Sequence, residues 1–400
     1  MVDGRSVHTT DDLDWYRHLP ASPAVRIGDM LAISGQVALD ADMYVVGRGD
    51  VIGQTHFVFD AIGRLLDTAG ATFDDVIDVI AFARDPRDIS DIFNVAAAYF
   101  ESPFPAWSTA AFLGSYTSDV LVSVRVIAHL GSGSKESYTP ESLRWWGSRP
   151  ASGGCKKNAI LFVSAQSAVD IEGHVLFPGD HCSQARNAYA SMLEVVAMAG
   201  GGVEDILDFT SFHQDIRGAE ATLIDVYARE VLGSVSAAHV ASTSHIGTPG
   251  LEKDGLLGTY RAVADLTPGR RIASTPDNIW WKDVLPVAGG AKKPTGSIIT
   301  VAGQVASASD GSIVSRGDAA GQARYVFKCM EEVLSGFGAT MDNVIEVMSF
   351  HKDPRAWETA MQVGQEFFAP ETGPAWTPVS VPGLWMEGYL HEISALAVVS

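Results

Sequence analysis

The sequence predicts an α+β fold built from three diverged copies of one unit of about 130 residues. Two short motifs recur in the same order along the 400 residues, and their copies keep the same intervals. The first motif ends on Gln36, Gln166 and Gln304, and the second ends on Asp85, Asp215 and Asp353. Both sets are spaced by 130 and then 138 residues. Equal intervals in separate motifs indicate true internal repeats.

Two further patterns mark each copy. A pair of aromatic residues precedes a proline, as Trp15-Tyr16, Trp145-Trp146 and Trp280-Trp281. Pro105-Ala106-Trp107 recurs as Pro374-Ala375-Trp376, and we align Ala237-Ala238-His239 with it in copy 2. The predicted copies are residues 1–133, 142–268 and 277–400. Segments 134–141 and 269–276 are rich in Gly, Ser and Pro or in charge, so we expect solvated connectors there.

Within each copy the hydrophobic pattern predicts the order β-β-α-β-α-β-β. In copy 1 we expect strands at 30–37, 76–82 and 120–128, and helices at 53–69 and 88–100. Apolar residues at Val58, Ile62 and Leu65 form one face of the first helix. Gly70 is expected to end that helix, because glycine tolerates a left-handed backbone.

Composition excludes several classes of function. The formal net charge is −20, which opposes binding to nucleic acid and to anionic membrane surfaces. No apolar run approaches the roughly 18 residues of a membrane span. The first residues lack the apolar stretch of a secretory signal, and the three cysteines form no CxxC pair, so we expect a cytoplasmic protein. No metal-ligand spacing or nucleotide-binding glycine motif is present, so neither a metal nor a cofactor is expected.

These motifs resemble the RidA/YjgF family. Its members carry Ser-Gly-Gln after the first long strand and a glutamine at the start of the first helix, here Gln54, Gln184 and Gln322. The resemblance implies a chorismate-mutase-like fold in which three units close around a central β-barrel. Here one chain supplies all three units, so we expect an intramolecular pseudo-trimer and a monomer or small homo-oligomer such as a dimer. The implied activity is hydrolysis of reactive imines or enamines in clefts between units.

The chain departs from the family at the implied carboxylate-binding site. The family places an arginine after Pro-Ala, and our alignment puts Trp107, His239 and Trp376 at that position. A tryptophan offers a stacking face and one N–H donor but no charge. We therefore expect a more apolar cleft, in which Trp107 and Trp376 contact substrate. Backbone N–H groups near Ser34, Ser164 and Gly303 are expected to polarise it.

The glutamate that the family carries in its last strand is present once, as Glu392, where copies 1 and 2 have Ser123 and Thr259. Burial would raise its pKa and suit it to general acid/base work. We predict Glu392 and His239 as catalytic residues, with Trp376 in the same cleft as Glu392. His213 and His351 share one strand position in two copies, which favours a structural role.

The leading hypothesis is a hydrolase or deaminase acting on a C–N bond of a small, partly apolar or aromatic metabolite. Three alternatives remain open at this point. The first is a non-catalytic small-molecule binding protein, and the second is a structural subunit of a larger assembly. The third is a ring-opening amidohydrolase or a cyclase on the same scaffold, for which Ser34 or Ser164 would pair with a basic residue such as Arg26 or Lys156.

Overall fold

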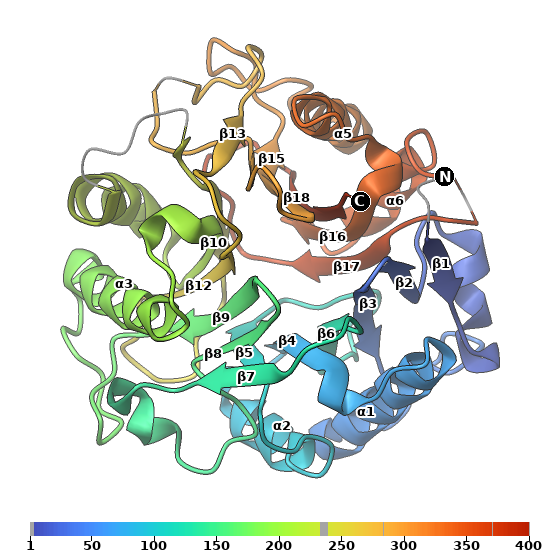
Figure 1. Cartoon of the computed structure of the whole chain (residues 1–400). Coiled ribbons are helices and arrows are strands. Elements are labelled where there is room, and N and C mark those ends of the chain that lie inside the picture. Colours follow the sequence, from blue (N-terminus) through green and yellow to red (C-terminus); the bar gives the residue numbers. More distant parts are fainter. Residues whose placement is uncertain (1–3, 233–238, 283, 370, 400) are drawn as a thin grey trace.

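The computed structural model describes residues 4–232, 239–282, 284–369 and 371–399. Within them the chain forms three mixed six-stranded sheets, one for each copy. The three units surround a common centre, and the long helices lie on the outside (Figure 1). The α+β fold class and the arrangement of three copies in one chain are confirmed. No helix in the described residues is both long and apolar enough to cross a membrane.

Copy 1 contains the predicted elements and one additional short strand at its start. The strand expected at 30–37 is β3 (Met30–Val37), and the helix expected at 53–69 is α1 (Val51–Thr68). The second helix is shorter than expected. The other elements are β1 (Arg5–His8), β2 (Ala24–Ile27), β4 (Val76–Ala83), α2 (Ile89–Ala96), β5 (Ala106–Ala111) and β6 (Val122–His129).

Copies 2 and 3 repeat this order. Copy 2 comprises β7 (Lys135–Tyr138), β8 (Gly154–Lys157), β9 (Ile160–Gln166), α3 (His181–Met198), β10 (Ile206–His213), α4 (Ala219–Ala221), a π-helix at Thr222–Leu232, β11 (Ser242–Gly247) and β12 (Gly258–Asp265). Copy 3 comprises β13 (Ile272–Ser274), β14 (Gly290–Lys292), β15 (Ile298–Val305), α5 (Ala319–Ser335), β16 (Val344–His351), α6 (Ala356–Gly364), β17 (Ala375–Ser380) and β18 (His391–Val398). Single 3-10 turns and two longer 3-10 segments, Asp11–His18 and Glu141–Trp146, connect these elements.

The two segments expected to be solvated connectors are partly strands. Segment 134–141 contains β7 and segment 269–276 contains β13, and each pairs antiparallel with the next strand of the following copy. Their composition misled the prediction because an edge strand exposes most of its side chains and so carries polar residues. The copies are therefore joined directly through their edge strands.

The same side chain starts the long helix of every copy. Asp50, Asp180 and Asp318 each precede the helix, and the side chain of each accepts a hydrogen bond from the backbone N–H three residues later. Such a cap satisfies one of the unpaired N–H groups at a helix start. Helix α1 ends at Ala69, and Gly70 follows with φ +70°, as the sequence predicts.

The ring closes through equivalent contacts between consecutive copies. In each sheet the last two strands in sequence order flank one strand, as β5 and β6 flank β4 in copy 1. Strand β5 pairs parallel with β4 and forms the outer edge of the sheet. Strand β5 lies against β9 of copy 2, β11 against β15 of copy 3, and β17 against β3 of copy 1. Single bridges join the copies at Ala106 with Ser152, Ser242 with Ala288, and Ala375 with Ser22. The expected central barrel thus consists of three separate sheets.

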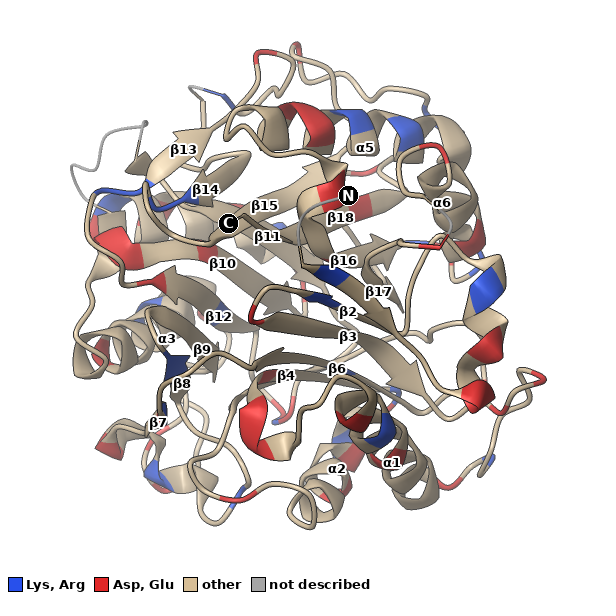
Figure 2. Ribbon diagram, turned by 45° about the vertical axis from the view of Figure 1, so that its right-hand side comes forward, with Lys and Arg blue, Asp and Glu red and all other residues tan. Residues whose placement is uncertain are grey.

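The interior has an outer and an inner core. The outer core lies between each sheet and its helices. The inner core contains apolar residues of all three copies, such as Ile77, Leu207 and Ile345 at equivalent positions. Most charged residues lie on the outer helices and loops (Figure 2). An exception is a buried cluster at the centre, made of Asp78, Asp208, Glu346, Arg125 and Arg261.

Candidate functional site

Strand pairing defines which residues are equivalent in the three copies. Asp78 pairs with Ala106, Asp208 with Ser242, and Glu346 with Ala375. Thr243 therefore holds in copy 2 the position that Trp107 and Trp376 hold in the other copies. The alignment of His239 with Trp107 is wrong. Asp215 lies 28 residues before Thr243, whereas Asp85 lies 22 residues before Trp107, so copy 2 carries six extra residues.

His239 lies in this longer stretch, and Ala237 and Ala238 of the same motif lie outside the described residues. The His239 ring nitrogen Nδ1 is 2.6 Å from the backbone oxygen of Arg271. Nε of Arg271 in turn donates to the backbone oxygen of His239 at 2.8 Å. These contacts support the chain where copy 2 leads into copy 3. They give no geometric support for catalysis by His239, which stays a prediction.

Trp107 and Trp376 hold the position of Thr243 at the other two junctions, and Trp107 lines a second pocket, between copies 1 and 2. The Trp376 side chain is fully buried, packs near Phe327 and Phe368, and donates from Nε1 to Ser349 at 2.8 Å. Trp107 packs against Phe93 and Phe100, but its Nε1 has no hydrogen-bond partner in the described residues.

The serines predicted to contact substrate hold the same two junctions together. The backbone N–H of Trp376 donates to Ser34 Oγ at 2.8 Å, and that of Trp107 donates to Ser164 Oγ at 2.6 Å. Each hydroxyl also donates to a backbone oxygen, of Ser22 and Ser152 respectively. Both serines are buried, and each hydroxyl group both donates and accepts a hydrogen bond within the protein.

The backbone N–H groups expected to polarise a substrate are also engaged. Gly303 donates to Ser244 Oγ at 2.9 Å across the junction of copies 2 and 3. The equivalent groups of Gly35 and Ala165 donate to Thr377 and Ser108 in the other two junctions. These hydrogen bonds therefore fix the position of each copy relative to the next.

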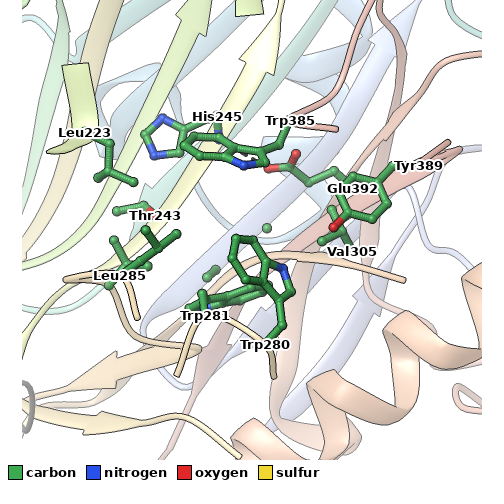
Figure 3. Close-up of a pocket in the computed structure, with 13 residues that line it drawn as sticks. Leu223, Thr243, His245, Trp280, Trp281, Leu285, Val305, Trp385, Tyr389 and Glu392 are labelled. Atoms are coloured by element: carbon green, nitrogen blue, oxygen red, sulfur yellow. Dashed lines mark hydrogen bonds between the residues drawn. The ribbon is translucent and has the colours of Figure 1, made fainter. Parts of the chain in front are cut away.

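The third junction, between copies 2 and 3, differs from the other two. It has Ala302 where copies 1 and 2 have the serine, and Thr243 in place of the tryptophan. It holds a cavity that is partly open to solvent (Figure 3). The lining residues are Leu223, Thr243 and His245 of copy 2, and Trp280, Trp281, Leu285, Val287, Ala302, Gly303, Val305, Trp385, Tyr389 and Glu392 of copy 3.

Glu392 on β18 supplies the carboxyl group of this cavity. It is 3% exposed, and burial raises its pKa to about 8. The backbone N–H of His245 donates to its Oε1 at 3.2 Å, which opposes that shift in part. Glu392 is therefore mostly a neutral carboxylic acid at pH 7. Trp376, expected in the same cleft, does not line this cavity and lies instead between copies 3 and 1, so that expectation is wrong.

The cavity walls are aromatic. Trp280 and Trp281 stand at 90° to each other on one side, and Trp385 and Tyr389 lie near Glu392 on the other (Figure 3). The indole N–H groups of Trp280 and Trp281 have no hydrogen-bond partner in the described residues. None of the residues that line the cavity is a lysine or an arginine. The arrangement suits a flat apolar molecule that can accept a hydrogen bond.

His245 on β11 is the residue that the sequence analysis missed. Burial lowers its pKa to about 4, so its ring is neutral at pH 7. The equivalent positions are Thr109 and Pro378. The sequence could have shown His245 as a histidine that only copy 2 carries at this strand position. The six extra residues of copy 2 hid the correct alignment. The cavity thus contains one carboxylic acid and one neutral imidazole.

The junction of copies 1 and 2 holds a second pocket, which is lined by Trp107 and also by charged side chains. Arg149 forms an ion pair with Glu252, and its guanidinium group stacks 4.7 Å from the Phe93 ring centre. Lys156 pairs with Glu136 at 3.4 Å and is therefore engaged away from Ser164. The Ser–Lys alternative gains no support from this geometry. Elsewhere in the described residues, side chains with metal-ligand spacing gather at Asp170, Glu172 and His174, largely in an exposed turn.

Comparison with known sequences identifies the family. The model of the family described as endoribonuclease L-PSP matches residues 18–130, 149–254 and 290–399. The chain belongs to this family. Its three matches correspond to the three copies, and the RidA/YjgF resemblance seen in the motifs is confirmed.

Individual family members match one copy at a time. A RutC family protein of Pyrococcus horikoshii is 33% identical over 110 residues, which cover 28% of this chain and 86% of the relative. The RutC family protein YjgH of Escherichia coli is 36% identical over 130 residues, covering 32% of this chain and 98% of YjgH. A chorismatase structure is similar over 81% of this chain and 93% of its own, with TM-score 0.51 and 13% identity. That likeness shows a shared fold.

Proposed function

We propose that this protein is an enzyme that hydrolyses a C–N bond of imine or enamine type in a small apolar or aromatic metabolite. The reaction would take place in the cavity between copies 2 and 3. The family membership supports small-molecule chemistry of this kind. The observation that carries the proposal is Glu392, a buried carboxylic acid with a pKa of about 8 on the wall of an aromatic cavity.

The lining residues support an uncharged substrate. Trp280, Trp281 and Trp385 offer flat apolar faces that favour an aromatic ring. A substrate carboxylate would find no cationic partner among the residues that line the cavity. Burying such a carboxylate without an ion pair is costly. Amino-acid-derived imines are therefore disfavoured, and neutral aromatic imines are favoured.

Glu392 supports the chemical step. Hydrolysis of an imine requires a proton on the nitrogen as water attacks the carbon. A carboxylic acid with a pKa near neutral pH is protonated often enough to donate and acidic enough to transfer the proton. Copies 1 and 2 carry Ser123 and Thr259 at the equivalent position, and hydroxyl groups cannot serve as such acids near pH 7.

The experiment compares Glu392→Gln with matched changes in the sister copies. Benzophenone imine serves as a neutral aromatic probe, and the measurement is ammonia release above the spontaneous rate. We expect Glu392→Gln to lose about 100- to 10,000-fold in kcat. Ser123→Ala and Thr259→Val should stay within a few-fold of the wild type. Equal small losses in all three variants would contradict the proposal.

The aromatic walls also favour a second candidate, a binding protein without catalysis. Tryptophan fluorescence distinguishes the two, because Trp280, Trp281 and Trp385 line the cavity. Saturable quenching by benzophenone imine without ammonia release would support binding alone. In that case Glu392→Gln should change affinity rather than rate.

A further inference from the structure

Three buried side chains of copy 2 form one hydrogen-bonded line that ends at the cavity. Nδ1 of His245 on β11 lies 2.7 Å from Oγ of Ser211 on the neighbouring strand β10. The same Oγ lies 2.8 Å from Nε2 of His213, two residues further along β10. All three residues are at most 7% exposed. The line therefore runs from the cavity wall into the interior of copy 2.

Both ends of this line lack a hydrogen-bond partner in the described residues, Nδ1 of His213 in the interior and Nε2 of His245 at the cavity. His245 lines the cavity, and its Nε2 is buried with no hydrogen-bond partner in the described residues. Because Nδ1 is turned towards Ser211, Nε2 lies on the opposite edge of the ring. A buried polar atom without a partner is costly unless a ligand or water completes it. The His245 ring also lies 5.2 Å from the Trp385 ring centre, which limits its rotation.

The line constrains which nitrogen of His245 carries the proton. Ser211 has a single hydroxyl proton. Its acceptor can be Nε2 of His213 or, at 3.5 Å, the backbone oxygen of Ser244. In either case Nδ1 of His245 must donate to Ser211, and Nε2 of His245 keeps a free lone pair; the second case also spares His213 a buried Nδ1 proton without an acceptor. Burial lowers the pKa values of both histidines, so both rings are neutral at pH 7. The other titratable groups that face these residues are Glu392 on β18, Tyr260 on β12, His181 on α3 and Asp215 after β10.

His245 and Glu392 are also linked directly. The backbone N–H of His245 donates to Glu392 Oε1 at 3.2 Å, so the two side chains start from adjacent points of the cavity wall. Figure 3 shows both residues beside Trp385 and across the cavity from Trp281. Two titratable groups whose environments move their pKa values apart are suited to act as acid and base.

We propose that His245 is the base that works with Glu392, and that Ser211 and His213 are positioning residues that fix its tautomer. This inference rests on the proposed hydrolysis. In the first step water forms a C–O bond to the imine carbon, Nε2 of His245 takes a proton from that water, and Glu392 protonates the nitrogen. The product is a neutral carbinolamine. In the second step the Glu392 carboxylate takes the hydroxyl proton, the C–N bond breaks, and the protonated His245 gives its proton to the leaving ammonia. Both residues return to their starting states.

The sister copies lack this combination, which provides matched controls. Copy 1 has Ala81 and Thr109 at the positions of Ser211 and His245. Copy 3 has Ser349 with Pro378, and Ser349 contacts His351 at 2.7 Å as Ser211 contacts His213. The pair of Ser349 and His351 therefore reproduces the buried serine–histidine contact without a cavity histidine. Ser349→Ala is the control for Ser211→Ala.

The test combines a pH profile with NMR on the full chain. In the wild type, kcat/KM for benzophenone imine should rise with pH through a pKa near 4, as His245 loses its proton, and fall through a pKa near 8, as Glu392 loses its proton. His245→Asn keeps a polar atom near Ser211 but removes Nε2. It should lose about 100-fold or more in kcat together with the acidic limb of the profile. Glu392→Gln should instead remove the alkaline limb.

The positioning role has its own measurement. Long-range ¹⁵N NMR of His245 should show an unprotonated Nε2 and a protonated Nδ1 at pH 7, and Ser211→Ala should shift that ratio and lower kcat about 10-fold. Ser349→Ala should change neither. If His245→Asn keeps the wild-type rate and profile while Glu392→Gln is inactive, the inference is wrong and the proposed function stands. If the wild type releases no ammonia, the proposed function fails with this probe. A proton on Nε2 of His245 in the NMR spectrum would overturn the inference that His245 is the base.

Discussion

Gly303 lies directly against the carboxyl group of Glu392. A Cβ atom built on Gly303 would be 2.1 Å from Oε1, closer than any real contact allows. The equivalent residue in copy 2 is Ala165, which sits beside the smaller Thr259 side chain. Copy 1 also has a glycine here, Gly35, against Ser123 and Thr377, but only in copy 3 is the neighbour of the glycine an acid.

Gly303→Ala should therefore displace the Glu392 side chain. We expect a loss of about 1–3 kcal/mol in the free energy of unfolding, because the added methyl group overpacks a closed site. Activity should fall at least 10-fold, and the alkaline limb of the pH profile should move. Denaturant unfolding and the kcat/KM profile measure the two effects. Ala165→Gly is the control, and an unshifted limb in Gly303→Ala would show that the close contact has no effect on the acid.

Thr243→Arg should change the preferred substrate charge. Thr243 lines the cavity at the position where the family carries its carboxylate-binding arginine, so the new guanidinium group would face the ligand. A charge-assisted pair contributes about 1.5–3 kcal/mol, which corresponds to roughly a 10- to 100-fold change. The ratio of kcat/KM for 2-iminopropionate to that for benzophenone imine should rise by this factor. Thr243→Val, which adds no charge, should leave the ratio unchanged.

Glu392 should make the protein less stable as the pH rises. Its pKa is about 8 in the folded state and 4.5 in its absence, so the folded state holds the proton more tightly. Its favourable contribution is complete below pH 4.5 and is lost as the pH rises through 8. The free energy of unfolding of Glu392→Gln, relative to that of the wild type, should therefore increase by up to about 5 kcal/mol between pH 4.5 and 9. Thr259→Val, which removes no titratable group, should follow the wild-type pH dependence in chemical denaturation.

The central charge cluster should respond unequally to two similar substitutions. Asp78 binds both Arg125 and Arg261, whereas Asp208 accepts hydrogen bonds from the hydroxyl groups of Ser242 and Thr210. Asp78→Asn leaves two buried cations short of a partner and should cost about 3–5 kcal/mol.

Asp208→Asn should cost about 1 kcal/mol, because its hydrogen-bond partners are neutral hydroxyl groups and burial raises the pKa of this acid despite the attraction of Arg261. Urea unfolding of both variants tests the difference. Equal losses would mean that the ion pairs of Asp78 add nothing to the free energy of unfolding.

Much of the fold follows from the sequence because the repeats are long and periodic. The strand at 30–37 and the start and end of α1 were predicted to within two residues, since an alternating pattern, an apolar helix face and Gly70 all act locally. The strands β7 and β13 were missed because edge strands resemble polar linkers.

The site was only partly predictable. Glu392 was predicted because the family resemblance places a glutamate in the last strand and only copy 3 carries one there. Its neighbours depend on which copies meet at each junction, and this is decided by long-range closure of the ring. Trp376 was therefore assigned to the wrong cleft, and His245 was missed because six extra residues shift the alignment in copy 2.

Fusion of the three copies into one chain also sets the number of ligands that the protein can bind. In an assembly of three identical subunits, any cleft that works is present three times. Here the junctions differ: the pocket between copies 2 and 3 carries Glu392 and His245, whereas the pocket between copies 1 and 2 is lined by Trp107 and by the ion pair of Arg149 with Glu252. Titration should therefore reach saturation at one equivalent per 42.5 kDa chain and show no cooperativity within it.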